Sequence, residues 1–308
     1  MTGLCFLPLT QQCLAQEELS YSLGMGIGVR NVELDFDADF GSAFASLASS
    51  PDKLFQATSG STTRFGAEET LYVANFSATL VYQQFYLTGL LELTPQSERT
   101  SLSTEIDANP GPGLPSEKTD TATDLSQYNF SVTLGYQVWE GLRFFSGYQY
   151  TELELDSKEF NPLAQDADTI YIERGFFLGS GYSWDFGEKG TLSLSIAYAN
   201  LDAKLSQNNV NTTPPPDGFA SGEFTFDGTS NGLSYGAQWS GPLAENWIYV
   251  ASLKFQSYTS DNNTTTFQSF AGDQVLGEPV TITPAIVTDL DSKHNDSTFT
   301  LGVHYLFD

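Results

Sequence analysis

Apolar and polar residues alternate with a period of two through most of the chain, and this alternation predicts β-strands rather than helices. The last segment shows it most clearly, because one face carries only apolar side chains: Phe299, Leu301, Val303, Tyr305 and Phe307. The other face carries Thr298, Thr300, Gly302 and His304. Such a strand requires an apolar environment on one side only.

Ten segments of this kind follow one another after Gln16, each near the ten or so residues that a tilted membrane strand requires. Two of them begin and end with tyrosine, at Tyr72 and Tyr82 and at Tyr128 and Tyr136. At a tilt of about 40°, the ten-residue step from Tyr72 to Tyr82 climbs roughly 25 Å, the height of a lipid-facing band. The ten segments are 19–33, 72–82, 85–93, 128–136, 142–150, 170–184, 192–201, 233–239, 247–255 and 299–307. The pattern therefore predicts an all-β fold, a single antiparallel up-and-down transmembrane barrel.

The connections between these segments alternate between short and long. The short ones are 83–84, 139–141, 185–190 and 241–246, and the long ones are 36–69, 94–125, 152–168, 202–220 and 259–296. Since short turns belong on the periplasmic side and long loops outside, both termini are expected in the periplasm. A hairpin within 280–290 would raise the strand number to twelve, although Pro279 and Pro284 disfavour insertion there.

Aromatic residues mark the expected membrane interfaces. All four tryptophans, Trp139, Trp184, Trp239 and Trp247, lie at or beside the short turns, where an amphipathic ring is most favourable. With Tyr72, Tyr82, Tyr128 and Tyr136 they are predicted to form interfacial girdles.

The closing strand also carries a resemblance to a known class of proteins. Its order Thr300, Gly302, Tyr305 and Phe307 resembles the C-terminal assembly signal of bacterial outer-membrane β-barrels. This resemblance implies a location in a Gram-negative outer membrane, recognition by the barrel-assembly machinery, and contact with outer-membrane lipid. It identifies no individual family.

The first fifteen residues differ from the rest. Leu4 to Leu9 form an apolar stretch, and Cys13-Leu14-Ala15 offers a small-x-small cleavage site before Gln16. We interpret residues 1–15 as an export signal and 16–308 as one barrel domain. The signal lacks the usual positively charged N-terminal region, which indicates that it is truncated. Both cysteines of the chain would leave with the signal.

The charge balance limits the partners. Asp and Glu outnumber Lys and Arg by 38 to 12, for a formal charge of −26, which excludes binding to a phosphate backbone. Most of the acid lies in the long loops, so divalent cations bridging them to anionic lipopolysaccharide are a hypothesis. No cofactor motif and no metal-ligand motif is recognised; the run of Asp35, Asp37 and Asp39 lacks the glycine and glutamate of a calcium loop.

The polar strand faces point to the lumen in this arrangement, and six ionisable residues are predicted to line it: Arg30, Glu92, Arg143, Glu173, Lys254 and His304. Glu92 and Lys254 are expected near mid-height, and Arg30 and Glu173 near the outer rim. They are interpreted either as ion pairs that satisfy one another or as groups that select a permeating solute. Many lumen positions are glycine, which fits sharp curvature as well as a narrow passage.

The favoured function is a porin-like narrow passive channel for small solutes or ions. The alternative is a non-conducting structural or adhesive barrel that presents acidic extracellular loops. Enzymes also occur among outer-membrane barrels, but the only histidines, His294 and His304, belong to no Asp-x-His or His-x-Ser arrangement. Asp289, Asp291 and His294 share one predicted outer loop as a candidate water-activating cluster. We interpret that cluster as a solvated acidic loop and predict that the chain is not an enzyme.

Overall fold

The computed structural model describes residues 19–40, 61–94, 98–107, 117–160, 165–211, 222–269, 274–275, 278–279 and 287–307. Within these ranges, side chains are described for 19–36, 68–94, 124–156, 168–206, 225–260 and 291–307. The predicted export signal lies outside the described residues.

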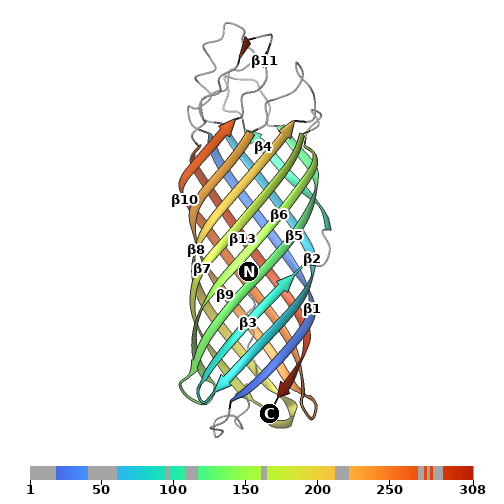
Figure 1. Cartoon of the computed structure of the whole chain (residues 1–308), viewed down its shortest axis with the longest axis vertical. Coiled ribbons are helices and arrows are strands. Elements are labelled where there is room, and N and C mark those ends of the chain that lie inside the picture. The colour runs from blue at the N-terminus through green and yellow to red at the C-terminus, as the bar shows by residue number, and fades with distance from the viewer. Residues whose placement is uncertain are drawn as a thin grey trace.

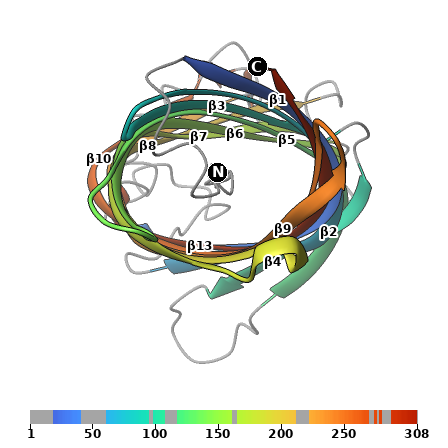
Figure 2. The same ribbon diagram turned by 90° about the horizontal axis from the view of Figure 1, so that it is seen from below.

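Long antiparallel strands form a closed barrel (Figures 1 and 2). The strands are β1 (Ser20–Phe40), β2 (Ser61–Tyr82), β3 (Phe85–Leu93), β4 (Glu98–Asp107), β5 (Glu117–Gln137), β6 (Leu142–Phe160), β7 (Gln165–Asp185), β8 (Thr191–Asn211), β9 (Gly222–Ala244), β10 (Trp247–Ser269) and β13 (Val287–Phe307). The strands pair in chain order, except that β3 and β4 each pair with β2 and β5 and not with each other. β1 pairs with both β2 and β13, which closes the cylinder. Pairing of the final strand with the first is as predicted.

The barrel has ten strand positions, because β3 and β4 occupy one position between β2 and β5. Leu93 at the end of β3 pairs with Ala74 of β2, and Leu102 of β4 pairs with Ala67 of β2. The chain from β3 to β4 therefore has two more residues than the facing part of β2. Of the region 280–290 proposed for a further hairpin, residues 287–290 belong to β13 and the others lie outside the described residues. The two-residue strands β11 (Gln274–Val275) and β12 (Glu278–Pro279) precede this region and pair only with each other among the described strands. Ten strands is therefore correct, and twelve is not.

The strands are about twice as long as predicted. Most span 19 to 23 residues and continue through much of the sequence interpreted as long loops. The physical reason is a reversal of phase: in β1 the apolar residues Met25, Ile27 and Val29 face outward, whereas Val32 and Leu34 face inward. The alternation continues past the reversal, but the apolar face changes sides.

This reversal occurs around the barrel and divides it into two sections. On nine strands the outward face changes from apolar to polar, and the last outward apolar residues before this change are Val29, Tyr72, Tyr128, Tyr150, Phe176, Tyr198, Leu233, Phe255 and Phe299. Two residues further along each strand the outward position is polar: Asn31, Thr70, Ser126, Glu152, Arg174, Asn200, Asn231, Ser257 and Ser297. Beyond the change, β7 again carries the apolar residues Ile172 and Ile170 on its outward face. On paired strands, the last outward apolar residues are either direct cross-strand partners or are displaced from each other by two residues. The change from apolar to polar therefore lies at a similar level on these strands.

We call the part with the apolar exterior the membrane section and the part with the polar exterior the outer section. An apolar outer band of this kind is stable only in lipid, as for Ile27 and Phe176, which are 73% and 70% exposed. The outer section instead buries its apolar residues in the lumen. They form one cluster, the apolar plug: Val32, Leu34, Phe36, Leu71, Leu125, Leu153, Leu155, Tyr171, Ala203, Leu205 and Phe226.

The tight turns after β2, β5, β7 and β9 lie at the end of the barrel where β13 finishes (Figure 1). The turn between β7 and β8 contains a short 3-10 helix, η3 (Gly187–Lys189). We call the end of the barrel that carries these tight turns the short-turn end. The membrane section adjoins it. Within the described residues, no helix is long and apolar enough to cross a membrane.

Candidate functional site in the barrel interior

A buried ionic network crosses the lumen where the two sections meet. Arg30 of β1 is 1% exposed, and its Nη2 lies 2.6 Å from Glu92 Oε2 on β3. Arg30 Nε donates to Thr298 Oγ1 at 2.9 Å and lies 3.6 Å from Asp296 Oδ2, both on β13. One guanidinium thus joins two carboxylates on separate strands, which suits its fixed set of donors.

The second half of the network is centred on His294 of β13. Its Nδ1 lies 3.0 Å from Glu173 Oε2 on β7, and its Nε2 lies 3.4 Å from Asp296 Oδ1. Glu173, fully buried, also accepts hydrogen bonds from Tyr171 Oη at 2.9 Å and Ser230 Oγ at 2.7 Å. Since β13 and β7 are four strands apart in the ten-position barrel, the contact between His294 and Glu173 spans the interior. We call Arg30, Glu92, Asp296, His294 and Glu173 the ionic strut.

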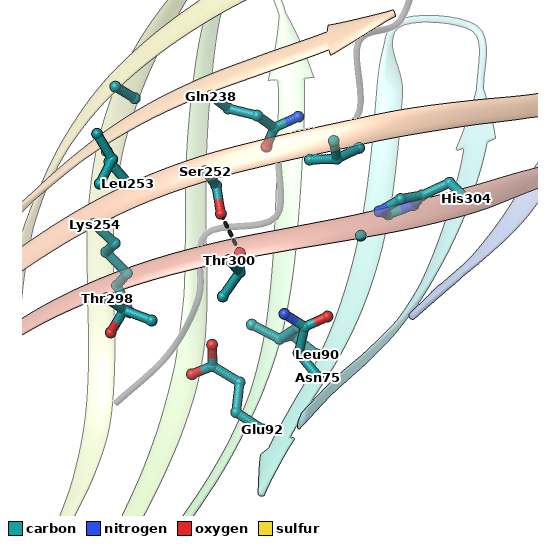
Figure 3. Close-up of a pocket in the computed structure, with 14 residues that line it drawn as sticks. Asn75, Leu90, Glu92, Gln238, Ser252, Leu253, Lys254, Thr298, Thr300 and His304 are labelled. Atoms are coloured by element: carbon teal, nitrogen blue, oxygen red, sulfur yellow. Dashed lines mark hydrogen bonds between the residues drawn. The ribbon is translucent and has the colours of Figure 1, made fainter. Parts of the chain in front are cut away.

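A small polar cavity of about 40 Å³ lies beside the strut, on the side of the short-turn end (Figure 3). Glu92, Lys254 and His304 line it, together with Asn75 and Gln238. On one side of it, Ser252 Oγ and Thr300 Oγ1 lie 2.5 Å apart. A cavity of this size holds a few water molecules at most.

Four aromatic side chains of the lumen each lie over a glycine of the neighbouring strand. The pairs are Tyr86 with Gly135, Phe145 with Gly179, Phe177 with Gly147, and Tyr258 with Gly232, all of them direct cross-strand partners. A Cβ added at these glycines would lie 2.0 to 2.4 Å from the ring. The glycines therefore provide room for aromatic rings rather than for a passage.

The six predicted lumen residues are all buried, but the structure does not bring them together as one lining. Arg30 and Glu92 form an ion pair, and Glu173 belongs to the same strut. Lys254 and His304 line the cavity, and Arg143 lies near the short-turn end. The expected heights are partly wrong, because Arg30 contacts Glu92 instead of lying above it at the rim.

The interpretation of Asp289, Asp291 and His294 as one solvated outer loop is wrong, because all three residues lie in β13. His294 lies in β13, 1% exposed, whereas Asp291 is exposed on the opposite face of the same strand, and the side chain of Asp289 lies outside the described set. The strut residues His294 and Asp296 were not predicted to line the lumen because 259–296 was interpreted as loop. The signal was present in the sequence, since His294, Asp296, Thr298 and Thr300 continue one face of the final strand.

The proposed girdle residues lie on the exterior at the membrane section. Tyr72, Tyr82, Tyr128 and Tyr136 are exposed there, as are Trp139, Trp184 and Trp247, while Trp239 is half-buried and donates from Nε1 to Tyr249 Oη at 2.9 Å. Of the proposed assembly signal, Thr300 is buried, Tyr305 contacts Trp247 edge to face, and Phe307 stacks on Tyr21.

No protein family model and no curated protein sequence matches this chain. The outer membrane protease OmpT from Escherichia coli is similar in structure, with a TM-score of 0.67, 11% identity, and coverage of 94% of this chain and 97% of OmpT. The barrel thus has an outer-membrane protein fold. The toluene transporter TodX of P. putida (TM-score 0.33, 10% identity, 96% and 92% covered) and the outer membrane protein OprG of Pseudomonas aeruginosa (0.33, 12%, 93% and 95%) are more distant.

The prediction that the chain is not an enzyme is wrong as an exclusion, because the same architecture carries a protease. The sequence argument searched for short motifs, whereas this fold joins residues far apart, such as His294 and Glu173. At 11% identity the likeness shows the fold alone and assigns no activity. Within the described residues, no group of three His, Cys, Asp or Glu side chains is arranged to hold a metal ion.

Proposed function

We propose that the protein is a closed outer-membrane barrel that anchors a rigid polar structure above the lipid. In this arrangement the short-turn end faces the periplasm, and the outer section carries the long connections away from the membrane. The apolar plug is the observation that carries the proposal, because a water-filled channel has a polar interior.

Three layers of packing support closure of the lumen. The apolar plug lies in the lumen of the outer section, the ionic strut crosses the junction, and the aromatic rings over glycine occupy part of the lumen. Small barrels filled by side chains do not conduct, whereas sixteen or more strands leave an aqueous channel. The porin-like channel favoured by the sequence would require these layers to move aside together.

Planar-bilayer recording on the refolded protein tests the proposal. The folded state is first verified by a shift of gel migration on heating, and a known porin added afterwards shows that the bilayer accepts barrels. The expected result is silence before the porin is added. Discrete conductance steps from the protein alone would contradict a closed barrel and restore the porin-like channel.

A variant with a reduced plug sharpens this measurement. Phe36 and Phe226 are 4% and 0% exposed within the plug, and replacing both by alanine removes two rings while retaining the strut. Replacing His294 by alanine in the same chain also removes the contact that spans the lumen. If the plug and strut close the barrel, ion leakage should increase in the order wild type, Phe36→Ala/Phe226→Ala, and the triple variant.

A further inference from the structure

His294 is the member of the ionic strut whose ordinary pKa lies near neutral pH, so its charge depends on the pH of the surroundings. It lies on the part of β13 that belongs to the outer section, because its chain neighbours Lys293 and Asn295 present polar side chains on the outward face. The chain has only one other histidine, His304, which lies in the membrane section and lines the cavity in Figure 3.

Two buried carboxylates lie on opposite sides of the His294 ring. Nδ1 is 3.0 Å from Glu173 Oε2 on β7, and Nε2 is 3.4 Å from Asp296 Oδ1 on the same strand as His294. A neutral imidazole has a single N–H group and can donate to only one of these carboxylates. The protonated ring donates from both nitrogens and carries the opposite charge. The arrangement therefore favours the protonated form of His294.

The other groups packed against His294 leave it as the one that changes charge. Its cross-strand partners are Tyr258 on β10 and the apolar Leu34 on β1, and the ring of Tyr171 on β7 lies edge-on with centroids 6.2 Å apart. Burial raises the pKa of both tyrosines, so their hydroxyls stay neutral where a histidine titrates. The nearby charged groups are Glu173, Asp296, Arg30 beside Asp296, and Glu92 beside Arg30.

The charges of the strut balance only when His294 carries its proton. Glu92, Asp296 and Glu173 are three carboxylates, and they face the cations Arg30 and Lys254, the second of which acts on Glu92 through its charge. Among the described residues, protonated His294 is the third cation. Asp296 depends on it most, because within the described part of the chain neither of its oxygens accepts a hydrogen bond. Loss of the proton leaves a buried negative charge without compensation, which is costly.

The direction of the pH effect follows from these contacts. Burial alone would lower the pKa of His294, but its contacts with Asp296 and Glu173 outweigh burial and raise this pKa above its usual value of 6.5. A group whose pKa is raised by folding stabilises the folded state below its unfolded pKa. This contribution is lost as the pH rises through the folded pKa. The strut is therefore complete at neutral pH and incomplete in alkaline solution.

We propose that His294 is a proton-dependent link between β7 and β13 across the lumen. The protonated ring holds Glu173 and Asp296 together, and loss of the proton in alkaline solution releases this connection and loosens the outer section. The link goes beyond the proposed function, because it concerns the pH range in which the interior is held together and not whether the lumen conducts.

Nuclear magnetic resonance of the refolded protein in detergent, with isotope-labelled histidine, measures the proton directly. His304→Gln leaves His294 as the only histidine and thereby assigns its resonance. The midpoint for loss of the proton is expected above about pH 7.5, at least about tenfold in proton affinity above an ordinary histidine. Glu173→Gln, which removes one carboxylate and keeps the shape, should lower the midpoint by about one pH unit or more. A wild-type midpoint below about pH 7.5, or an unchanged midpoint in Glu173→Gln, would overturn the proposal.

Thermal unfolding in the same detergent, from about pH 6 to about pH 10, tests whether this proton stabilises the barrel. At the lowest pH, His294→Gln should unfold at least about 4 °C below the wild type, because the ring charge between the carboxylates is absent. The difference should shrink toward zero as the pH rises through the His294 midpoint, since both proteins then lack that charge.

His304→Gln is the matched control, because His304 is also a buried histidine of β13 but lies outside the strut. It should retain the pH dependence of the wild type. A difference between wild type and His294→Gln that stays constant with pH would contradict the link. If His294→Gln does not refold, the wild type decides: a melting temperature that does not fall through the His294 midpoint overturns the proposal. Neither measurement involves conductance, so failure here is distinguishable from failure of the closed barrel.

Discussion

The membrane section and the outer section share the same strands but bury opposite faces. On β8, Leu194, Ile196 and Tyr198 point outward in the membrane section, whereas Leu201, Ala203 and Leu205 point inward in the outer section. The backbone ladder continues through both without a break from Thr191 to Asn209. One strand is thus a membrane strand at one end and a strand of a water-soluble barrel at the other.

The difference shows that the surroundings, rather than strand geometry, decide which face is apolar. In lipid the exterior is apolar and the lumen takes polar groups, and above the lipid the requirement is reversed. At the junction both preferences meet, so polar side chains face polar side chains across the lumen. The ionic strut lies there, where its members Arg30, Glu92 and Glu173 are shielded from water on every side.

The largest expected effect comes from breaking the strut that joins the two sections. Arg30→Leu leaves the buried carboxylates of Glu92 and Asp296 without their guanidinium and should lower the free energy of unfolding by about 3 to 5 kcal/mol. Arg174→Leu is the control, since Arg174 is exposed on the outer section and should change it by less than about 0.5 kcal/mol. Urea titration in lipid vesicles measures both; equal effects would show that the strut contributes no more than a surface arginine.

Lysine substitutions along the outward face of β8 locate the boundary between the sections. Ile196→Lys places a charge against lipid and should destabilise the barrel by about 2 to 4 kcal/mol. Asn200→Lys, four residues further along the same face, is expected to cost less than about 0.5 kcal/mol, because that position faces water. The same urea titration applies, and similar costs at both positions would place the lipid boundary elsewhere.

The packing of rings over glycine is tested by adding one methyl group to a glycine of the membrane section, either on the lumen side of the barrel wall or on its exterior. At Gly179 a Cβ would lie 2.4 Å from the Phe145 ring and 2.6 Å from a backbone oxygen, so Gly179→Ala should destabilise by about 1 to 3 kcal/mol. Gly89 has nothing within 4 Å of its added Cβ, and Gly89→Ala should be neutral. If thermal unfolding shows Gly179→Ala to be neutral as well, the lumen is less densely filled than the structure indicates.

The smallest effect concerns acidic residues on the exterior of the outer section. Asp156 lies directly across from Asp124 and from Asp168, and like charges so placed repel each other. Asp156→Asn should therefore stabilise by about 0.2 to 1 kcal/mol in the presence of a chelator. If divalent cations bind here, as the acidic composition suggested, calcium should stabilise the wild type more than the variant. If calcium stabilises the wild type and the variant equally, these three aspartates do not bind the cation.

The sequence predicted the all-β class, the ten strands, the short turns and the closing pair, because in the membrane section one apolar face per strand is unambiguous. It did not predict the outer section, since a reversal of phase such as that between Val29 and Val32 reads as the end of a strand. The contacts of the strut depend on register around the whole barrel, so no local pattern places Arg30 beside Glu92 or His294 beside Glu173.

The rings that lie over glycines also constrain how this chain can change over evolutionary time. Because Phe145 with Gly179 and Phe177 with Gly147 alternate sides between β6 and β7, each ring occupies volume that its partner gives up. A side chain gained at one position is tolerated only if its partner becomes smaller. Related sequences should therefore exchange ring and glycine as a pair, and such reciprocal exchanges would reveal the register of neighbouring strands even where overall identity has been lost.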